Sequence, residues 1–246
     1  MNILLTNDDG IDSPGLRLLA DALRKNSSHR VLVLAPDTDC SGFSHSIRFL
    51  WNPIKISQRD SDAWACSGSP ADCVIMALLG ALPVKPDLVI SGINRGANMG
   101  TDLVYSGTAA AARQAGLGGI PAIALSLAGT GEFYWDMAVS WTVDHLEELR
   151  NVWRSDTFVN VNIPNSPGGP DGMANTFPSR TSYHDKLSVF EAPDGNSWYF
   201  VEFGTVNALP APGSDWEAVS KNLAAVSPVF VHPVNGPGED GKQAWQ

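Results

Sequence analysis

A chain of 246 residues, of which 43% are hydrophobic, is long enough to fold around one sizeable core. Its formal net charge of −10 argues against a nucleic-acid polymer as partner, since such binders need a basic surface that releases counterions. The N-terminus has no basic stretch before a long apolar run, and no apolar stretch reaches membrane-spanning length. The three cysteines form no Cys-x-x-Cys pair, which favours reduced thiols over disulfides or a zinc site. We therefore expect a cytoplasmic protein that does not bind membranes.

The first residues of the chain predict a strand, an acidic turn and a helix. Residues 3–5 (Ile-Leu-Leu) are a continuous apolar run, the pattern of a strand that is covered on both faces. Residues 7–10 (Asn-Asp-Asp-Gly) are turn formers. Ser13 followed by Pro14 is a helix start, and leucines at helical spacing follow it.

Asp8 and Asp9 lie in this turn, at the carboxyl end of the first predicted strand. Open α/β sheets bind their ligands at this edge. Adjacent carboxylates repel each other, so a site that keeps both ionised usually supplies a cation. The pair is therefore a candidate divalent-metal site, and an ordinary solvated turn is the alternative that this stretch alone leaves open.

Apolar runs and helical spacings alternate along the chain up to residue 164. Strands are predicted at 31–35, 86–92, 122–127 and 158–164, and helices at 70–81, 106–116 and 135–149. This alternation predicts a three-layer α/β fold with a Rossmann-like, mostly parallel sheet. Residues 1–164 would form the catalytic core. Residues 165–246 would be an irregular extension of the same domain that carries a β-hairpin or extended arm, because Pro, Gly, Ser and Asn dominate its first part.

Two further loops place oxygen-bearing side chains at the same edge of the predicted sheet. One loop carries Ser41, and the other, long and glycine-rich, carries Asn94 and Asn98. Carboxylate, hydroxyl and amide oxygens are hard donors suited to Mg²⁺ or Mn²⁺, whereas no histidine or cysteine cluster indicates zinc. An ordinary turn serine and turn asparagines would be the alternative.

A candidate anion site follows at Ser106-Gly107-Thr108, where a helix is predicted to begin. Hydroxyls and free main-chain amides at a helix N-terminus attract negative charge. A metal site beside such an anion cradle favours phosphate-ester chemistry. The sequence has neither Gly-x-Gly-x-x-Gly after its first strand nor a P-loop, which argues against a dinucleotide oxidoreductase and a P-loop kinase. A non-catalytic nucleotide- or anion-binding module with the same cradle is the alternative.

Several of these stretches, in this order along the chain, resemble the SurE family, the stationary-phase survival proteins that are 5'/3'-nucleotidases. The longest matching motifs are Leu-Leu-Thr-Asn-Asp-Asp-Gly-Ile-Asp-Ser-Pro-Gly (4–15), Pro-Asp-Leu-Val-Ile-Ser-Gly-Ile-Asn-Arg-Gly-Ala-Asn-Met-Gly (86–100) and Tyr-Ser-Gly-Thr-Ala-Ala-Ala-Ala (105–112). Shorter matches are Ala-Pro-Asp (35–37), Ser-Gly (41–42) and Gly-Ser-Pro-Ala-Asp-Cys-Val (68–74).

The resemblance implies a divalent-metal-dependent phosphatase that hydrolyses nucleoside 5'- and 3'-monophosphates to nucleoside and phosphate. One Mg²⁺ or Mn²⁺ ion per subunit would be held at the family's ligand positions, which are here Asp8, Asp9, Ser41 and Asn94. The family's phosphate-facing positions are here Asn98, Ser106, Gly107 and Thr108. Asp8 or Asp9 would orient or deprotonate the attacking water. Family members also pair through an extended C-terminal arm, which implies a homodimer or homotetramer.

Some alternatives stay open at this point. Either Asp8 or Asp9 is the catalytic base or nucleophile. His45 is a candidate general acid, and a loop histidine that faces solvent is the simpler interpretation. The eight tryptophans are typical of core and subunit contacts. One of them, or Phe43, is the alternative candidate for holding a nucleobase. The sequence does not choose between Mg²⁺ and Mn²⁺, between nucleotides, or between a dimer and a tetramer.

Overall fold

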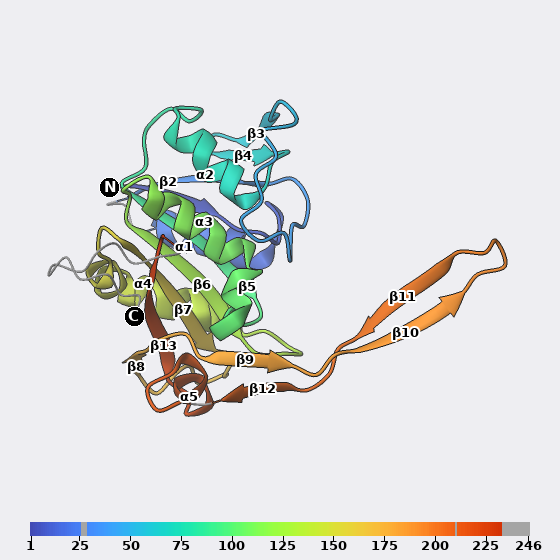
Figure 1. The fold of residues 1–246 in the computed structure, drawn as a ribbon. Coiled ribbons are helices and arrows are strands. Elements are labelled where there is room, and N and C mark those ends of the chain that lie inside the picture. The colour runs from blue at the N-terminus through green and yellow to red at the C-terminus, as the bar shows by residue number, and fades with distance from the viewer. Residues whose placement is uncertain (26–28, 210, 233–246) are drawn as a thin grey trace, which may run out of the picture.

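Nine strands form one central sheet in the computed structural model, which describes residues 1–25, 29–209 and 211–232 (Figure 1). In their order across the sheet, the strands are β3 (Ile56–Asp60), β4 (Ala63–Cys66), β2 (Arg30–Pro36), β1 (Asn2–Thr6), β5 (Leu88–Arg95), β6 (Ala122–Ala128), β7 (Thr157–Pro164), β13 (Ala224–Phe230) and β8 (Met173–Asn175). The strands from β4 to β7 run parallel, whereas β3 and β13 are antiparallel to their inner neighbours. The predicted mostly parallel sheet is confirmed.

Helices cover both faces of the sheet and complete the predicted three layers (Figure 1). The helices are α1 (Pro14–Lys25) and α4 (Trp135–Val152) on one face, and α2 (Pro70–Leu78) and α3 (Gly107–Leu117) on the other. Strand β1 serves both cores, because Ile3 and Leu5 face α1 and α4 while Leu4 faces α2 and α3. Within the described ranges, none of the helices combines the length and the hydrophobicity that crossing a bilayer requires.

The chain changes direction across the sheet at β1. From β1 it runs outward to β2 and β4, then returns to the opposite side of β1 at β5 and continues outward through β6 and β7. At such a switch point the loops that leave the carboxyl ends of the strands diverge, and ligands bind in the crevice between them. The fold therefore brings the loops after β1, β2 and β5 to one place.

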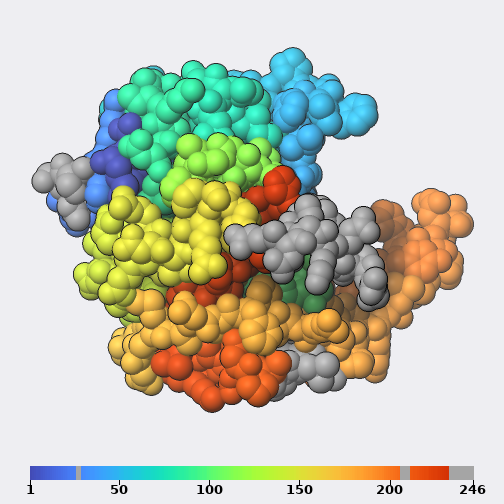
Figure 2. Space-filling model, turned by 60° about the vertical axis from the view of Figure 1, so that its left-hand side comes forward, coloured from blue at the N-terminus to red at the C-terminus, as the bar shows by residue number. Residues whose placement is uncertain are grey.

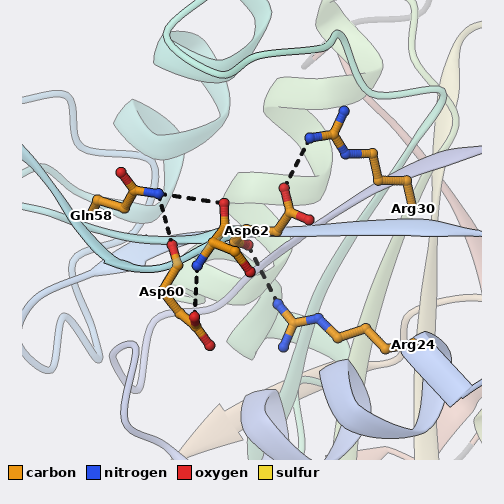
Figure 3. Close-up of polar contacts among 6 residues, drawn as sticks. Arg24, Arg30, Gln58, Asp60 and Asp62 are labelled. Carbon is orange, nitrogen blue, oxygen red and sulfur yellow. Dashed lines mark hydrogen bonds and ion pairs between the residues drawn. The ribbon is translucent and has the colours of Figure 1, made fainter.

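The outer β3–β4 pair is tied to the body by charged contacts around Asp62 (Figure 3). The Arg30 guanidinium donates to the Asp62 carboxylate at 3.0 Å, and Arg24 of α1 donates to the Asp62 main-chain oxygen at 3.4 Å. Gln58 donates to the main-chain oxygen of Asp60 at 3.0 Å and closes the turn. Because Arg30 opens β2 and Asp62 directly precedes β4, these contacts lie at the amino ends of the parallel strands, opposite the ligand-binding edge.

Past residue 164 the chain forms a β-rich extension and then returns to the central sheet. The elements before β13 include β9 (Arg180–Tyr183), β10 (Lys186–Glu191), β11 (Ser197–Glu202), β12 (Val206–Leu209) and α5 (Asp215–Ser220). The sequence pattern predicts neither α5 nor β13. Pro228 lies within β13, and a proline inside an apolar run argues against a strand when only the sequence is read. Residues 233–246 of the predicted extension lie outside the described residues.

Strands β10 and β11 form a hairpin that projects from the body of the molecule (Figure 1 and Figure 2). The hairpin stands on a second antiparallel pair, β9 with β12. Its large side chains are exposed, with Trp198 59%, Tyr199 63% and Phe200 57% accessible. The predicted C-terminal hairpin is therefore confirmed.

Candidate active site

The turn after β1 is fixed by its own side chains. The Asn7 amide donates to the main-chain oxygen of Gly10 at 2.9 Å and to the Ser13 hydroxyl at 2.6 Å. Gly10 has a φ of +95°, which favours glycine at this corner. Asp8 and Asp9 lie between these anchors and are thereby held at the carboxyl end of β1.

Asp8 is almost completely buried, with 4% of its surface accessible. The Thr108 hydroxyl donates to Asp8 Oδ1, so the first turn of α3 packs against this carboxylate. A Cβ atom on Gly107 would lie only 2.7 Å from Asp8 Cβ and 2.9 Å from Asp8 Oδ2. Gly107 and Thr108 therefore contact and position Asp8, and this close approach requires glycine at position 107.

Burial and mutual repulsion oppose the ionisation of the two aspartates. Burial raises the pKa of Asp8, and the hydrogen bond from Thr108 counteracts part of this effect. Burial, with a further contribution from the charge of Asp8, raises the pKa of Asp9 to about 6. A cation beside the two carboxylates would favour their ionised forms.

Ser41 and Asn94 each present an oxygen atom whose orientation is set by a hydrogen bond. The Ser41 hydroxyl donates to Asp39 Oδ1 at 2.6 Å, so the lone pairs of its oxygen stay available. Asn94 lies near the end of β5, where the register with β6 shifts between Ser91 and Asn94, and such bulges re-aim side chains beside active sites. Its Nδ2 donates to the main-chain oxygen of Gly96 at 3.0 Å, which leaves its Oδ1 as an acceptor.

Asn98 is held by polar side chains of β6 and β7. Its main-chain N–H donates to Asn162 Oδ1 at 2.8 Å, and its main-chain oxygen accepts from the amides of Asn160 and Asn162 at 2.9 and 3.0 Å. Its own Nδ2 donates to Ser126 Oγ at 2.8 Å. These three partners are fully buried, so the position of Asn98 is fixed by the sheet itself.

One cavity of about 260 Å³ brings five of the predicted site residues together, namely Asp8, Ser41, Asn94, Asn98 and Ser106. Ser106 is the N-cap of α3 and accepts from the main-chain N–H of Ala109 at 3.0 Å. The cavity thus joins oxygen donors to the positive end of a helix dipole. Asp9 lines an adjacent, larger hollow instead.

The cavity wall also contains residues that are not among the predicted site residues, including Arg95, Asp102 and Tyr105. Asp102 belongs to a short 3-10 helix, η1 (Gly100–Val104), within the stretch predicted to be an irregular loop. The Tyr183 hydroxyl of β9 donates to the Asp102 carboxylate, so the C-terminal extension reaches this wall. The sequence signal for these residues is only their proximity to Asn94 and Ser106 along the chain.

The structure places His45 and Phe43 outside the wall of this cavity. His45 Nε2 lies 2.9 Å from Gln114 Oε1, and burial lowers the pKa of the imidazole. The Arg48 guanidinium lies 5.0 Å from the centre of the Phe43 ring. Neither residue therefore lines this cavity.

The oxygen donors at this site fit a hard divalent cation. Two carboxylates, a hydroxyl and an amide oxygen are ligands that suit Mg²⁺ or Mn²⁺. In the part of the chain that the structure describes, no three His, Cys, Asp or Glu side chains are grouped closely enough to hold a metal ion. A cation bound here would therefore draw on Ser41 and Asn94 as well as on the aspartates.

Known proteins match this chain over most of its length. The family model of Survival protein SurE matches residues 3–185. The 5'-nucleotidase SurE of Thermosipho melanesiensis is 38% identical over 96% of this chain and 93% of its own length. That of Thermosynechococcus vestitus is 37% identical over 100% and 96%. The crystal structure of the SurE protein from Aquifex aeolicus matches with a TM-score of 0.83 at 35% identity, over 96% of this chain and 95% of that chain.

Proposed function

This chain belongs to the SurE family of survival proteins, and from this premise we propose that it is a phosphatase that hydrolyses nucleoside 5'- and 3'-monophosphates to nucleoside and phosphate. One observation carries the phosphatase chemistry. A single cavity joins the buried Asp8 carboxylate, the oxygen donors Ser41 and Asn94, and the N-terminus of α3. The matches to relatives named 5'-nucleotidase SurE extend over almost the whole length of those relatives, which supports a nucleotide as the substrate.

One divalent cation, Mg²⁺ or Mn²⁺, would be held by Asp8, Asp9, Ser41 and Asn94. Such an ion, when bound, polarises a phosphoryl oxygen and lowers the pKa of a water. A hydrogen bond orients each of these four side chains and leaves an oxygen atom free for the ion. Asp8 Oδ1 accepts from Thr108, Asp9 Oδ2 accepts from the Arg95 main chain, and one further oxygen of each carboxylate is left for the ion.

Activation of the water and binding of the phosphate are assigned to different residues. Asp8 or Asp9 orients the attacking water or accepts its proton. Asn98 and Ser106 hold the phosphoryl oxygens, together with the main-chain amides of Gly107 and Thr108 at the positive end of α3. Asn98 can do so without rearrangement because Asn162 and Ser126 already fix it.

The proposed assembly is a homodimer or homotetramer formed through the β10–β11 hairpin. Leu187 is 62% exposed and the neighbouring Phe203 is 91% exposed, in addition to the hairpin aromatics described above. Contiguous exposed apolar surface of this kind marks interaction sites. A second copy of the same hairpin would cover it.

The proposed partners are small molecules, and the proposed location is the cytoplasm. Cys40, Cys66 and Cys73 are free, buried thiols, which suits a reducing compartment. The net charge of −10 disfavours binding to nucleic-acid polymers.

Phosphate release from a panel of monoesters tests the proposed function. The panel contains the 5'-monophosphates of adenosine, guanosine, cytidine and uridine, adenosine 3'-monophosphate and p-nitrophenyl phosphate, each with Mn²⁺, Mg²⁺ or EDTA. We expect metal-dependent release that EDTA abolishes, with nucleotides preferred to p-nitrophenyl phosphate. Folded protein that binds phosphate but releases none with any metal would be a binding module instead.

A further inference from the structure

We propose that a hollow beside the catalytic cavity binds the nucleoside part of the substrate, an inference that rests on the function proposed above. The hollow has a volume of about 640 Å³ and is lined by Arg95, Phe133 and Trp135, among others. It is a specificity subsite, because it would recognise the base and ribose that are attached to the phosphate in the cavity.

The catalytic cavity alone is small for a nucleotide. Its volume of about 260 Å³ lies below the range of about 300–1,000 Å³ that is usual for pockets that bury small-molecule ligands. The adjacent hollow, at about 640 Å³, lies within that range. The cavity therefore suits the phosphate group, and the remainder of a nucleoside monophosphate needs the second space.

Adjacent residues join the two spaces. Arg95 lines both of them. Asp8 lines the cavity, and the next residue, Asp9, lines the hollow. The Arg95 main-chain N–H donates to Asp9 Oδ2 at 3.2 Å and holds this junction together. A substrate whose phosphate lies beside Asp8 therefore reaches the hollow by passing Arg95.

The hollow offers a stacked planar surface that suits a nucleobase. The rings of Phe133 and Trp135 are stacked, with their centres 5.4 Å apart and their planes 20° from parallel. The guanidinium carbon of Arg95 lies 5.1 Å from the centre of the Phe133 ring. Bases that are bound by proteins stack on aromatic rings and on guanidinium planes. Both rings are partly buried against the core, so they keep their positions.

The loop that carries Phe133 and leads into α4 at Trp135 is anchored by Asn165, which follows β7. Asn165 Oδ1 accepts from the main-chain N–H of Tyr134 at 3.0 Å, and its Nδ2 donates to the main-chain oxygen of Glu132 at 2.7 Å. A Cβ atom on Gly129 would lie 2.5 Å from Asn165 Cβ, so the loop starts in close contact with this residue. The hollow is therefore preformed, as binding pockets usually are.

The charges around the hollow favour a nucleoside over a second phosphate group. Asp9, Asp12, Asp39 and Glu132 line it, and Arg95 is the cation among its lining residues. The excess of negative charge repels phosphate, whereas carboxylates accept hydrogen bonds from ribose hydroxyls and base amino groups. The substrate would thus bind with its phosphate toward Asp8 and its nucleoside toward the aromatic pair.

The test separates ring stacking from general damage by using two variants of Phe133. Phe133→Leu keeps an apolar side chain without a ring, and Phe133→Trp keeps a ring. We expect Phe133→Leu to raise KM for AMP about tenfold and to leave kcat/KM for ring-free glycerol 3-phosphate within about twofold. Phe133→Trp keeps the wild-type KM for AMP. The matched control is Trp51→Ala, which removes an 80% exposed ring outside the hollow and changes neither value.

Three results would overturn the subsite. The first is an unchanged KM for AMP in Phe133→Leu. The second is an equal loss of kcat/KM for AMP and for glycerol 3-phosphate in that variant. The third is a KM for AMP that rises in Tyr105→Ala but not in Phe133→Leu. Calorimetry with adenosine gives a readout that does not need turnover. Binding that is about tenfold weaker in Phe133→Leu supports the subsite even where no phosphate is released, in which case only the proposed function fails. Folded wild-type protein that does not bind adenosine would refute the subsite.

Discussion

The candidate catalytic cavity and the β10–β11 hairpin depart from the usual distribution of side chains in opposite directions. At the cavity, Asp8, Asn94 and Asn98 are polar and buried. On the hairpin, Trp198 and Phe200 are apolar and more than half exposed. Buried polar groups and exposed apolar ones both cost free energy, and proteins keep them where a ligand or a partner completes the surface. The comparison supports both proposals, a small charged ligand in the cavity and a second protein surface on the hairpin.

The largest effect is expected from Asp8→Asn, which removes a carboxylate from the buried cavity. Phosphate release at saturating Mn²⁺ should fall by more than about 100-fold. Changing a residue that only supports a metal ligand costs up to about 100-fold, and Asp8 is proposed to be a ligand itself. Asp21→Asn, on the exposed face of α1, is the matched control and should be neutral. Wild-type turnover in Asp8→Asn would remove Asp8 from the chemistry.

Gly107→Ala tests whether the packing of α3 against Asp8 is part of the site. The added Cβ would lie 2.7 Å from Asp8 Cβ, so Asp8 must shift. We expect kcat/KM to fall by about tenfold or more, because displacements near 1 Å can cost 100-fold. Gly168→Ala adds the same methyl group where nothing lies within 4 Å and should leave kcat/KM unchanged. Similar losses in both variants would show that the close contact at Asp8 is not the cause.

Asp9→Asn should stabilise the protein in EDTA, and more strongly as the pH rises. The pKa of Asp9 is raised to about 6 in the folded state, above its unfolded value of about 4. The folded state therefore binds more protons between these values, and the wild-type protein loses stability as the pH rises through this window. Asparagine does not titrate, so the difference in Tm between variant and wild type should grow between about pH 4 and pH 7. Saturating Mn²⁺ should reverse the order, and a pH-independent difference would contradict the prediction.

The smallest effect on activity is expected from Phe200→Glu in the hairpin. The charge should prevent association, as measured by sedimentation, while the unfolding free energy of the body changes by less than about 0.5 kcal/mol. Lys186→Glu on the same hairpin adds negative charge without removing apolar surface and is the control. A loss of turnover in Phe200→Glu as large as that in Asp8→Asn would mean that the arm is part of the catalytic site.

Much of the core could be predicted because its signals are local. Residues 3–5 and 31–35 are apolar on both faces, and Ser69 with Pro70 forms the expected helix start, including a capping box with Asp72. The meeting of Asp8 with Asn94 and Asn98 could also be anticipated, since parallel strands place their carboxyl ends at one edge.

The remainder depends on contacts that are distant in sequence. Nothing near Asn98 indicates that Asn162, 64 residues later, accepts from its main chain. The packing of Gly107 against Asp8 follows only from the position of α3. The stacked pair Phe133 and Trp135 has the spacing of an ordinary helix entry, and only the fold shows that it lines a hollow beside Asp9.

The pairing of β9 with β12 has a consequence for how the arm can vary. The chain enters the arm after Tyr183 and leaves it at Val206, and these two residues are paired with each other. Residues 184–205 therefore form one long loop that the β9–β12 pair closes at its base. Each doubling of the length of such a loop costs only about 0.6 kcal/mol in closure entropy. The length of this arm can therefore change at a small cost in free energy. A longer or shorter arm would change the proposed assembly, while the strands of the central sheet that carry the candidate site keep their register.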